Sequence, residues 1–286
     1  MDWGLVSRIP LAYAARVGSF RLTAEEEKSL DRDGFVLRHG VFSAQDVHAM
    51  RAAGEALVAE LVKDRRGKRY NVGSYTFESD RARDVMIKWE GDSDVVHGIE
   101  PVAHLSPELR GWGYDPRLVD PMRAIVADPD PSLYTEKLNL KRPHAGGVNP
   151  LHQDFPYWDG VADDATRVAT AMIFLDDAHR ANGCLEVLPG SHRRGRWPTR
   201  KDGDPFGQLE LDPAAAEGEL HRLVPIEVKA GAVVFFGPFL VHKSEPNRSA
   251  LERRALLYSY QPKGKTPYIE IARKLRAARA ASSSRA

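Results

Sequence analysis

Three side chains in this sequence have the types and spacing of a metal-binding set. His152 and Asp154 are two residues apart in the segment Asn149–Phe155, and side chains two apart on an extended strand point to the same face. His242, at the end of an apolar run about 90 residues later, supplies a second imidazole. Two imidazoles and one carboxylate on one face of an iron ion leave positions open for a cosubstrate and for dioxygen. The same donors also suit zinc, so a zinc hydrolase is an alternative.

Arg253 follows His242 by eleven residues and is placed to bind an anion. A strand that returns antiparallel after His242 brings this arginine back towards the metal end of the site. A dicarboxylate cosubstrate that chelates the metal must anchor its far carboxylate, and a guanidinium group is a planar, bidentate partner for it. Ser244 adds a hydroxyl to the same place. Arg254 points to the opposite face of a regular strand, so one arginine faces the pocket and the other is solvated or ion-paired.

Further motifs extend this pattern. They are Leu151–Asp154, Asn182–His192, His242–Ser244 with Asn247, Arg253, and Asp33–Val36 ahead of a helix from Ser43. In this combination the chain resembles the phytanoyl-CoA dioxygenase family of 2-oxoglutarate oxygenases. The resemblance extends over nearly the whole chain and is weakest over residues 60–130. The combination is far more specific than any one of the motifs.

The resemblance implies an enzyme that uses Fe(II), 2-oxoglutarate and O2 to hydroxylate a small organic substrate, an acyl-CoA or a secondary metabolite. Succinate and CO2 are the implied coproducts. Desaturation, epimerisation or cyclisation with the same cofactors are alternative outcomes, and a non-catalytic jelly-roll binding protein is an alternative of another class. The implied fold is mainly β with flanking α-helices: a double-stranded β-helix (jelly-roll, cupin-like) core buttressed by N-terminal helices.

The resemblance also implies roles for individual residues. His152, Asp154 and His242 are the implied iron ligands, and Arg253 is the implied anchor of the 5-carboxylate of 2-oxoglutarate. Other cosubstrate-binding side chains are expected at Ser244, Asn139, Gln153 and Thr170. Halogenases related to the family have a small residue in place of the carboxylate, so Asp154 argues against halogenation.

Aromatic and amide side chains near these motifs are the candidate substrate contacts. Tyr157 and Trp158 directly follow the metal motif, and they either line the mouth of the pocket or pack beneath a loop. Asn71 and Tyr75 lie in an irregular stretch that forms a lid in members of the family. The basic loop over residues 193–201 either binds phosphates of an acyl-CoA or a nucleotide or, as is more common for such runs, is a solvated surface.

The elements that must position these residues divide at about residue 130. Before it, Thr23 and Ser43 each precede acidic residues and a periodic apolar pattern, which is typical of helix N-termini. Helices are expected from Thr23 to Asp33, from Ser43 to Leu61, over Ser79–Lys88 and over Pro116–Ala127. A short strand is expected over Phe35–Leu37, and residues 65–80 show no regular pattern.

After Pro131, short apolar or alternating runs separated by Gly, Pro, Asn and Asp predict antiparallel strands. They are Leu133–Lys141, Val168–Leu175, Cys184–Leu188, Ile226–Val228, Ala232–Phe236, Leu240–His242 and Arg253–Tyr260. We expect one domain, residues 1–286, with helical support and a lid over 1–130, the jelly-roll core over 131–262 and a tail over 263–286. The polar stretch 193–220 is expected to be a surface loop and residues 277–286 to be frayed.

Composition narrows the function classes further. The chain has 286 residues, 42% of them hydrophobic, with 41 basic and 40 acidic side chains and a net charge of +1. This balance does not suggest a nucleic-acid partner, and no apolar run of membrane-spanning length occurs. The single cysteine, Cys184, excludes an internal disulfide and fits a cytoplasmic location. Residues 1–20 are interpreted as an N-terminal arm and not as a signal peptide.

Overall fold

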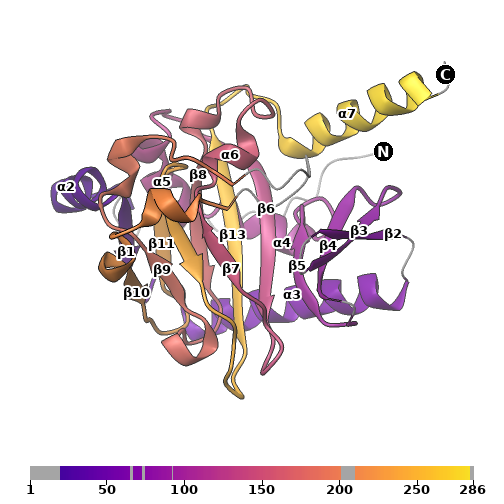
Figure 1. Cartoon of the computed structure of the whole chain (residues 1–286), viewed down its shortest axis with the longest axis horizontal. Helices are drawn as coiled ribbons and strands as arrows, with labels where there is room; N and C mark the ends of the chain where they lie inside the picture. The colour runs from indigo at the N-terminus through magenta and orange to yellow at the C-terminus, as the bar shows by residue number, and fades with distance from the viewer. Residues whose placement is uncertain (1–19, 65–66, 73–74, 92, 201–209, 284–286) are drawn as a thin grey trace, which may run out of the picture.

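The structure is a computed structural model, which describes residues 20–64, 67–72, 75–91, 93–200 and 210–283. The expected N-terminal arm therefore lies outside the described residues except for Phe20. Within them, two antiparallel sheets face each other and helices cover the larger sheet (Figure 1). This arrangement is the double-stranded β-helix fold, and the predicted fold class is confirmed.

The larger sheet has nine strands. In spatial order they are β1 (Phe35–Arg38), β11 (Val233–Phe236), β8 (Ala169–Phe174), β13 (Arg253–Gln261), β6 (Ser132–Lys141), β5 (Val96–Glu100), β4 (Val85–Glu90), β3 (Tyr75–Asp80) and β2 (Lys68–Val72). The smaller sheet has four strands, β10 (Val224–Ile226), β9 (Leu185–Val187), β12 (His242–Ser244) and β7 (Asn149–His152). Every strand pair is antiparallel.

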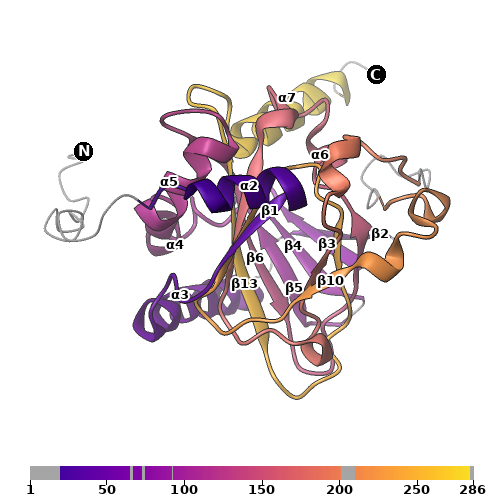
Figure 2. The same cartoon turned by 90° about the vertical axis from the view of Figure 1, so that its left-hand side faces the viewer.

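The helices of the described residues lie mostly outside this sandwich. They are α2 (Ala24–Asp33), α3 (Ala44–Lys63), α4 (Pro107–Trp112), α5 (Pro116–Ile125), α6 (Phe155–Trp158) and α7 (Tyr268–Ser283), with 3-10 turns at Ala165–Arg167, Arg180–Asn182, Ser191–Arg194, Pro213–Ala216 and Leu220–Arg222. None of them is long and apolar enough to cross a lipid bilayer. Figure 2 shows α3, α4 and α5 on one side of the larger sheet and β10 on the other.

Helix α3 is the main support of the larger sheet. It begins at a capping box, in which Ser43 and Asp46 satisfy each other's backbone amides. Its buried face packs with residues of β4, β6, β8 and β13 in one hydrophobic cluster. A side-chain carbon at Gly54 would lie 3.3 Å from Leu138 of β6, so this glycine lets the helix approach the sheet closely.

Strands β8 and β11 are buried on both faces, which explains why their sequences read as continuous apolar runs. Ile173 and Phe235 belong to the cluster beneath the helices. Their neighbours Phe174 and Phe236 point the other way and pack against β9 of the smaller sheet. The two cores therefore meet at these strands, which link the helical layer to the small sheet.

The helices predicted at α2, α3 and α5 and the predicted strands after residue 130 are present, with shifts of a few residues at the ends. The helix predicted over Ser79–Lys88 is wrong, because β3 ends at Asp80 and β4 begins at Val85. Burial in β4 alternates residue by residue, which a strand produces and a helix does not. Residues 1–130 are consequently not mostly helical, since β2–β5 extend the larger sheet.

Two expectations about loops also change. Residues 277–283, expected to be frayed, continue α7. The polar stretch 193–220 contains 3-10 turns and an isolated bridge between Thr199 and Leu211, and its residues 201–209 lie outside the described part.

Ile173→Ala is expected to destabilise the protein by about 2–5 kcal/mol, because it leaves a cavity in the fully buried strand β8. Urea unfolding followed by circular dichroism measures this free energy. The matched control is Leu275→Ala on the exposed surface of α7, which should change stability by less than about 0.5 kcal/mol. Equal effects of the two changes would contradict the role assigned to β8.

Candidate active site

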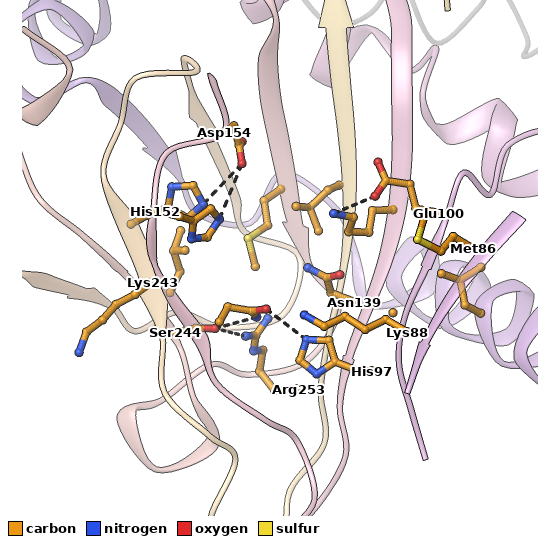
Figure 3. A pocket seen from close by; sticks show the side chains of 18 of the residues that line it. Met86, Lys88, His97, Glu100, Asn139, His152, Asp154, Lys243, Ser244 and Arg253 are labelled. Carbon is orange, nitrogen blue, oxygen red and sulfur yellow. Dashed lines mark hydrogen bonds and ion pairs between the residues drawn. The ribbon is translucent and has the colours of Figure 1, made fainter. Parts of the chain in front are cut away.

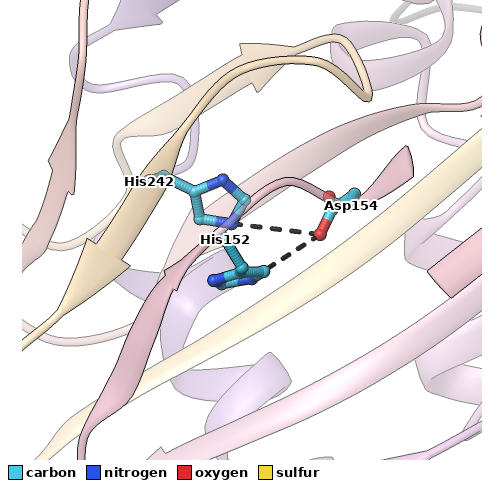
Figure 4. Close-up of side chains that lie close together, drawn as sticks. All are labelled: His152, Asp154 and His242. Carbon is cyan, nitrogen blue, oxygen red and sulfur yellow. Dashed lines mark ion pairs between the residues drawn. The ribbon is translucent and has the colours of Figure 1, made fainter. Parts of the chain in front are cut away.

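The fold brings His152, Asp154 and His242 together. Pairing of β7 with β12 sets His242 opposite His152, and Asp154 follows at the start of α6. The Nε2 atoms of His152 and His242 lie 3.8 and 3.9 Å from Oδ1 of Asp154, and the two imidazole centroids are 4.1 Å apart (Figure 4). One donor atom from each residue lies within 4.8 Å of the others.

Backbone carbonyls orient both imidazoles. Nδ1 of His152 lies 2.7 Å from the carbonyl oxygen of Pro150, and Nδ1 of His242 lies 3.0 Å from that of Leu240. A carbonyl oxygen only accepts, so each Nδ1 carries the hydrogen and each Nε2 presents its lone pair. The lone pairs and the carboxylate converge on one point, an arrangement that fits a divalent metal ion.

Burial shifts the pKa values of two of these donors. It lowers the pKa of His152 well below its usual value, which keeps the imidazole neutral, and it raises the pKa of Asp154. Thr170 of β8 lies 3.4 Å from Oδ2 of Asp154 and 3.0 Å from the hydroxyl of Ser259. Thr170 therefore supports the carboxylate from behind and does not line the cavity next to it.

A cavity of about 150 Å³ opens beside the three donors, between the two sheets (Figure 3). Strands β4, β5 and β6 form one wall, and β12 with the start of β13 forms another. Asp154 and Arg253 lie at opposite ends of the group of side chains drawn in Figure 3. The cavity thus connects the candidate metal donors with a buried cation.

Arg253 is only 2% exposed. Its guanidinium group donates to the carbonyl oxygen of Gly183 at 2.9 and 3.1 Å and to the hydroxyl of Ser244 at 3.4 Å. No carboxylate among the described residues forms an ion pair with it, and burial lowers its pKa to about 10, so it is still charged at neutral pH. A buried, charged arginine without a counter-ion is suited to bind a carboxylate from a ligand.

Arg254 faces the other side of β13. It forms ion pairs with Asp176 at 2.8 Å and with Glu55 at 3.0 Å, beneath the helical layer. Of the two neighbouring arginines, Arg253 is therefore the one that lines the cavity and Arg254 is the one that is ion-paired.

Two asparagines complete the wall near Arg253. Asn139 of β6, which the sequence analysis expects to bind the cosubstrate, lines the cavity. Asn149 of β7 was not predicted, and its amide donates to the Ser244 hydroxyl at 3.1 Å. His97 of β5 lies 3.2 Å from the amide oxygen of Asn149, and its other ring nitrogen lies 2.5 Å from Glu90. This chain of contacts fixes the hydroxyl beside the arginine.

Gln153 does not line the cavity, contrary to the expectation that it binds the cosubstrate. Its amide donates to the carbonyl oxygens of Gly195 and Phe239 at 2.9 and 2.6 Å, and its oxygen accepts from the Trp197 amide at 2.8 Å. All of these partners are backbone groups of Gly195, Trp197 and Phe239, so the side chain is engaged away from the metal donors. Gln153 thus links the segment around Gly195 and Trp197 to the segment around Phe239.

The predicted substrate contacts also lie outside the cavity lining. Tyr157 is 37% exposed, with its ring edge-on to His152 at 5.9 Å, and Trp158 packs against Tyr134. Asn71 accepts a hydrogen bond from Thr76, and Tyr75 is buried with its ring against the Lys88 ammonium group. Side chains of β4 and its neighbours, among them Met86, Lys88, Glu100 and Lys137, line the cavity instead. The sequence analysis missed this strand because it assigned Ser79–Lys88 to a helix; the alternation of Ile87, Lys88, Trp89 and Glu90 between apolar and charged residues was the signal that could have revealed it.

The described arginines of the basic loop have partners at the surface. Arg193 contacts Asp31, Arg194 lies over the ring of Trp197, and Arg196 forms an ion pair with Asp159 at 2.7 Å. These contacts favour a solvated loop over a phosphate site. Lys201 lies outside the described residues.

Comparison with known proteins agrees with this geometry. The model of the phytanoyl-CoA dioxygenase (PhyH) family matches residues 30–255. The chain belongs to the phytanoyl-CoA dioxygenase family. Ectoine dioxygenase of Bordetella parapertussis is 28% identical over 264 residues, covering 88% of this chain and 79% of that protein. L-Proline trans-4-hydroxylase of Streptomyces griseoviridis is 36% identical over 155 residues, covering 47% and 56% of the two chains.

The fold is also that of a solved relative. EctD from S. alaskensis, crystallised with 2-oxoglutarate and 5-hydroxyectoine, superimposes with a TM-score of 0.67 at 24% identity, covering 84% of this chain and 76% of that one. Membership of the family confirms the predicted enzyme class, a 2-oxoglutarate-dependent non-haem iron dioxygenase, and the predicted cofactors Fe(II), 2-oxoglutarate and O2.

Thr170→Val is expected to weaken metal binding about tenfold, because it removes the hydroxyl that supports Asp154 while keeping the side-chain shape. Competition with a chelating dye measures the dissociation constant for Zn(II). The matched control is Ser259→Ala, which removes the other partner of Thr170 and leaves the hydrogen bond to Asp154 in place. An unchanged constant in Thr170→Val would show that the carboxylate needs no such support.

Proposed function

We propose that this enzyme hydroxylates a small organic substrate, with His152, Asp154 and His242 as the iron ligands and Arg253 as the anchor of 2-oxoglutarate. The observation that carries the proposal is the cavity itself. Three converging donors lie at one end of it, and a buried arginine without a carboxylate partner among the described residues lies at the other. A dicarboxylate can chelate the metal ion with one end and pair its other carboxylate with the arginine.

Each part of the site then has a distinct task. When bound, iron and 2-oxoglutarate supply the oxidising power that inserts one atom of O2 into a C–H bond, with succinate and CO2 as coproducts. The carbonyls of Pro150 and Leu240 keep the two Nε2 atoms aimed at the metal position. Arg253 and Ser244 bind the far carboxylate of the cosubstrate, and Asn139 lines the space between.

The size of the cavity favours a compact substrate over a complete acyl-CoA. Its volume is about 150 Å³, and the β4–β6 wall that closes it belongs to the larger sheet. Two of the relatives are named for compact substrates, ectoine and L-proline. Asp154 fills the position that a halide would need, which favours hydroxylation over halogenation.

Other outcomes would use the same residues. Desaturation, epimerisation and cyclisation need the same ligands and cosubstrate, and product analysis distinguishes them from hydroxylation. A zinc hydrolase would have no use for the buried charge of Arg253, and a non-catalytic binding protein would have to keep the three converging metal donors without using them.

We also infer that the chain forms a single oxygenase domain in the cytoplasm. Strands β2–β5 of the first part continue the sheet that β6, β8 and β13 of the second part build, so the two parts share one core. The one cysteine, Cys184, is buried and free, which fits a reducing compartment.

The test adds Fe(II) and 2-oxoglutarate to the metal-free protein without oxygen and records the visible spectrum. We expect a weak charge-transfer band that is absent in His152→Ala. Arg253→Met should raise the 2-oxoglutarate dissociation constant about ten- to a hundredfold, as expected for lost charge-assisted hydrogen bonds. Arg194→Met, which removes a surface arginine, is the control and should leave the constant unchanged.

No band in the unmodified protein, with iron demonstrably unbound, would overturn the oxygenase assignment. A band that persists in His152→Ala would reject this residue as a ligand. Circular dichroism of each variant separates these outcomes from misfolding.

A further inference from the structure

Lys88 lines the cavity from β4 and has no role in the site described so far. Burial alternates along this strand: Val85, Ile87 and Trp89 lie in the core beneath the helices, and Met86 and Lys88 point into the cavity. Figure 3 shows the Lys88 side chain reaching towards the region between Asn139 and His97. Its ammonium group therefore faces the space in which ligands must bind.

This ammonium group has no anionic partner among the described residues. It lies 3.5 Å from the centroid of the Tyr75 ring and 6.0 Å from that of Phe77, and no hydrogen bond or ion pair to it is found in the described part of the chain. Glu90, two residues further along, is engaged with His97 and with the Gly147 amide instead. The aromatic face compensates only part of the cost of a desolvated cation.

The other cations around the cavity are all accounted for. Lys137 forms an ion pair with Glu100 at 2.9 Å, and Lys243 forms one with Glu245 at 2.6 Å. Arg253 is assigned to the cosubstrate. Burial, with the nearby charge of Lys137, lowers the pKa of Lys88 to about 7, so this position penalises the charged form until an anion enters.

When iron and 2-oxoglutarate are bound, the charges of the site cancel without the charge of Lys88. Iron(II) contributes two positive charges and Asp154 one negative charge, while 2-oxoglutarate contributes two negative charges and Arg253 one positive charge. These sum to zero, so the cosubstrate does not need a second cation for neutrality. The second ligand that must enter the cavity is the substrate. Lys88 is therefore available to pair with a negatively charged group of the substrate.

We propose that the substrate carries a carboxylate group and that Lys88 binds this group inside the cavity, so that Lys88 determines which molecules are oxidised. This inference rests on the proposed function, because it assumes that Arg253 is occupied by 2-oxoglutarate. Lys88 is a specificity-determining residue in this scheme and takes no part in holding the metal. The substrate class is thus a compact carboxylic acid, with amino acids included.

The experiment uses propionate as the probe and propionamide, its neutral isostere, as the comparison. The full chain is loaded with Zn(II), a diamagnetic substitute for iron, and with saturating 2-oxoglutarate, which keeps Arg253 occupied. Saturation-transfer NMR then reports binding of both propionate and 2-oxoglutarate in one sample. We expect propionate to bind at least about tenfold more tightly than propionamide, the gain of one charge-assisted hydrogen bond.

Lys88→Met should weaken propionate binding about tenfold or more and leave 2-oxoglutarate binding unchanged. Lys88→Arg should restore a preference for propionate over propionamide. The matched control is Lys229→Met, which removes an exposed lysine that is ion-paired with Asp177 and does not line the cavity. It should change neither dissociation constant.

Four results would overturn the proposal. Equal binding of propionate and propionamide, or no binding of propionate, would show that the cavity does not select a carboxylate. Undiminished propionate binding in Lys88→Met would assign it to another group, and weakened 2-oxoglutarate binding in this variant would assign Lys88 to the cosubstrate. Failure of 2-oxoglutarate to bind the unmodified protein would instead reject the proposed function, so the two failures are distinguishable.

Discussion

The candidate site depends on the register between β7 and β12. Antiparallel pairing sets His242 opposite His152, although the two residues are far apart in the chain. Each imidazole then bonds through Nδ1 to the carbonyl two residues before it, of Pro150 in one case and of Leu240 in the other. Because side chains alternate along a strand, a slip by one residue would turn one imidazole to the opposite face and remove it from the donor set.

That register is fixed by the core between the sheets. Strand β12 also pairs with β9, which sets Val187 opposite His242. Val187 packs in one cluster with Phe174 and Phe236 of the larger sheet, whose strands are themselves buried on both faces. The positions of the two imidazoles are thus a consequence of strand packing. The loops next to them are connected to the site through contacts such as those of Gln153.

Alternation along strands explains both the success and the errors of the sequence-based predictions. It anticipated that His152 and Asp154 point to one site, although β7 ends at His152 and Asp154 begins α6. The same rule puts Gln153 on the other face and marks Val85–Glu90 as a strand, and both were mispredicted where it was not applied. The contact between His97 and Asn149 could not be predicted, because it requires β5 and β7 to face each other across the sandwich, and no local pattern encodes that arrangement.

The two sheets divide the work of the site between them. The smaller sheet carries both imidazoles, and strands β4 to β6 of the larger sheet carry Lys88, Lys137 and Asn139. These three side chains line the cavity and none of them is a proposed metal ligand, so substitutions among them can change which molecule is bound while all three ligands are kept. In a fold of this kind, substitutions on the inner face of one sheet can therefore change the substrate while the metal donors on the other sheet stay the same.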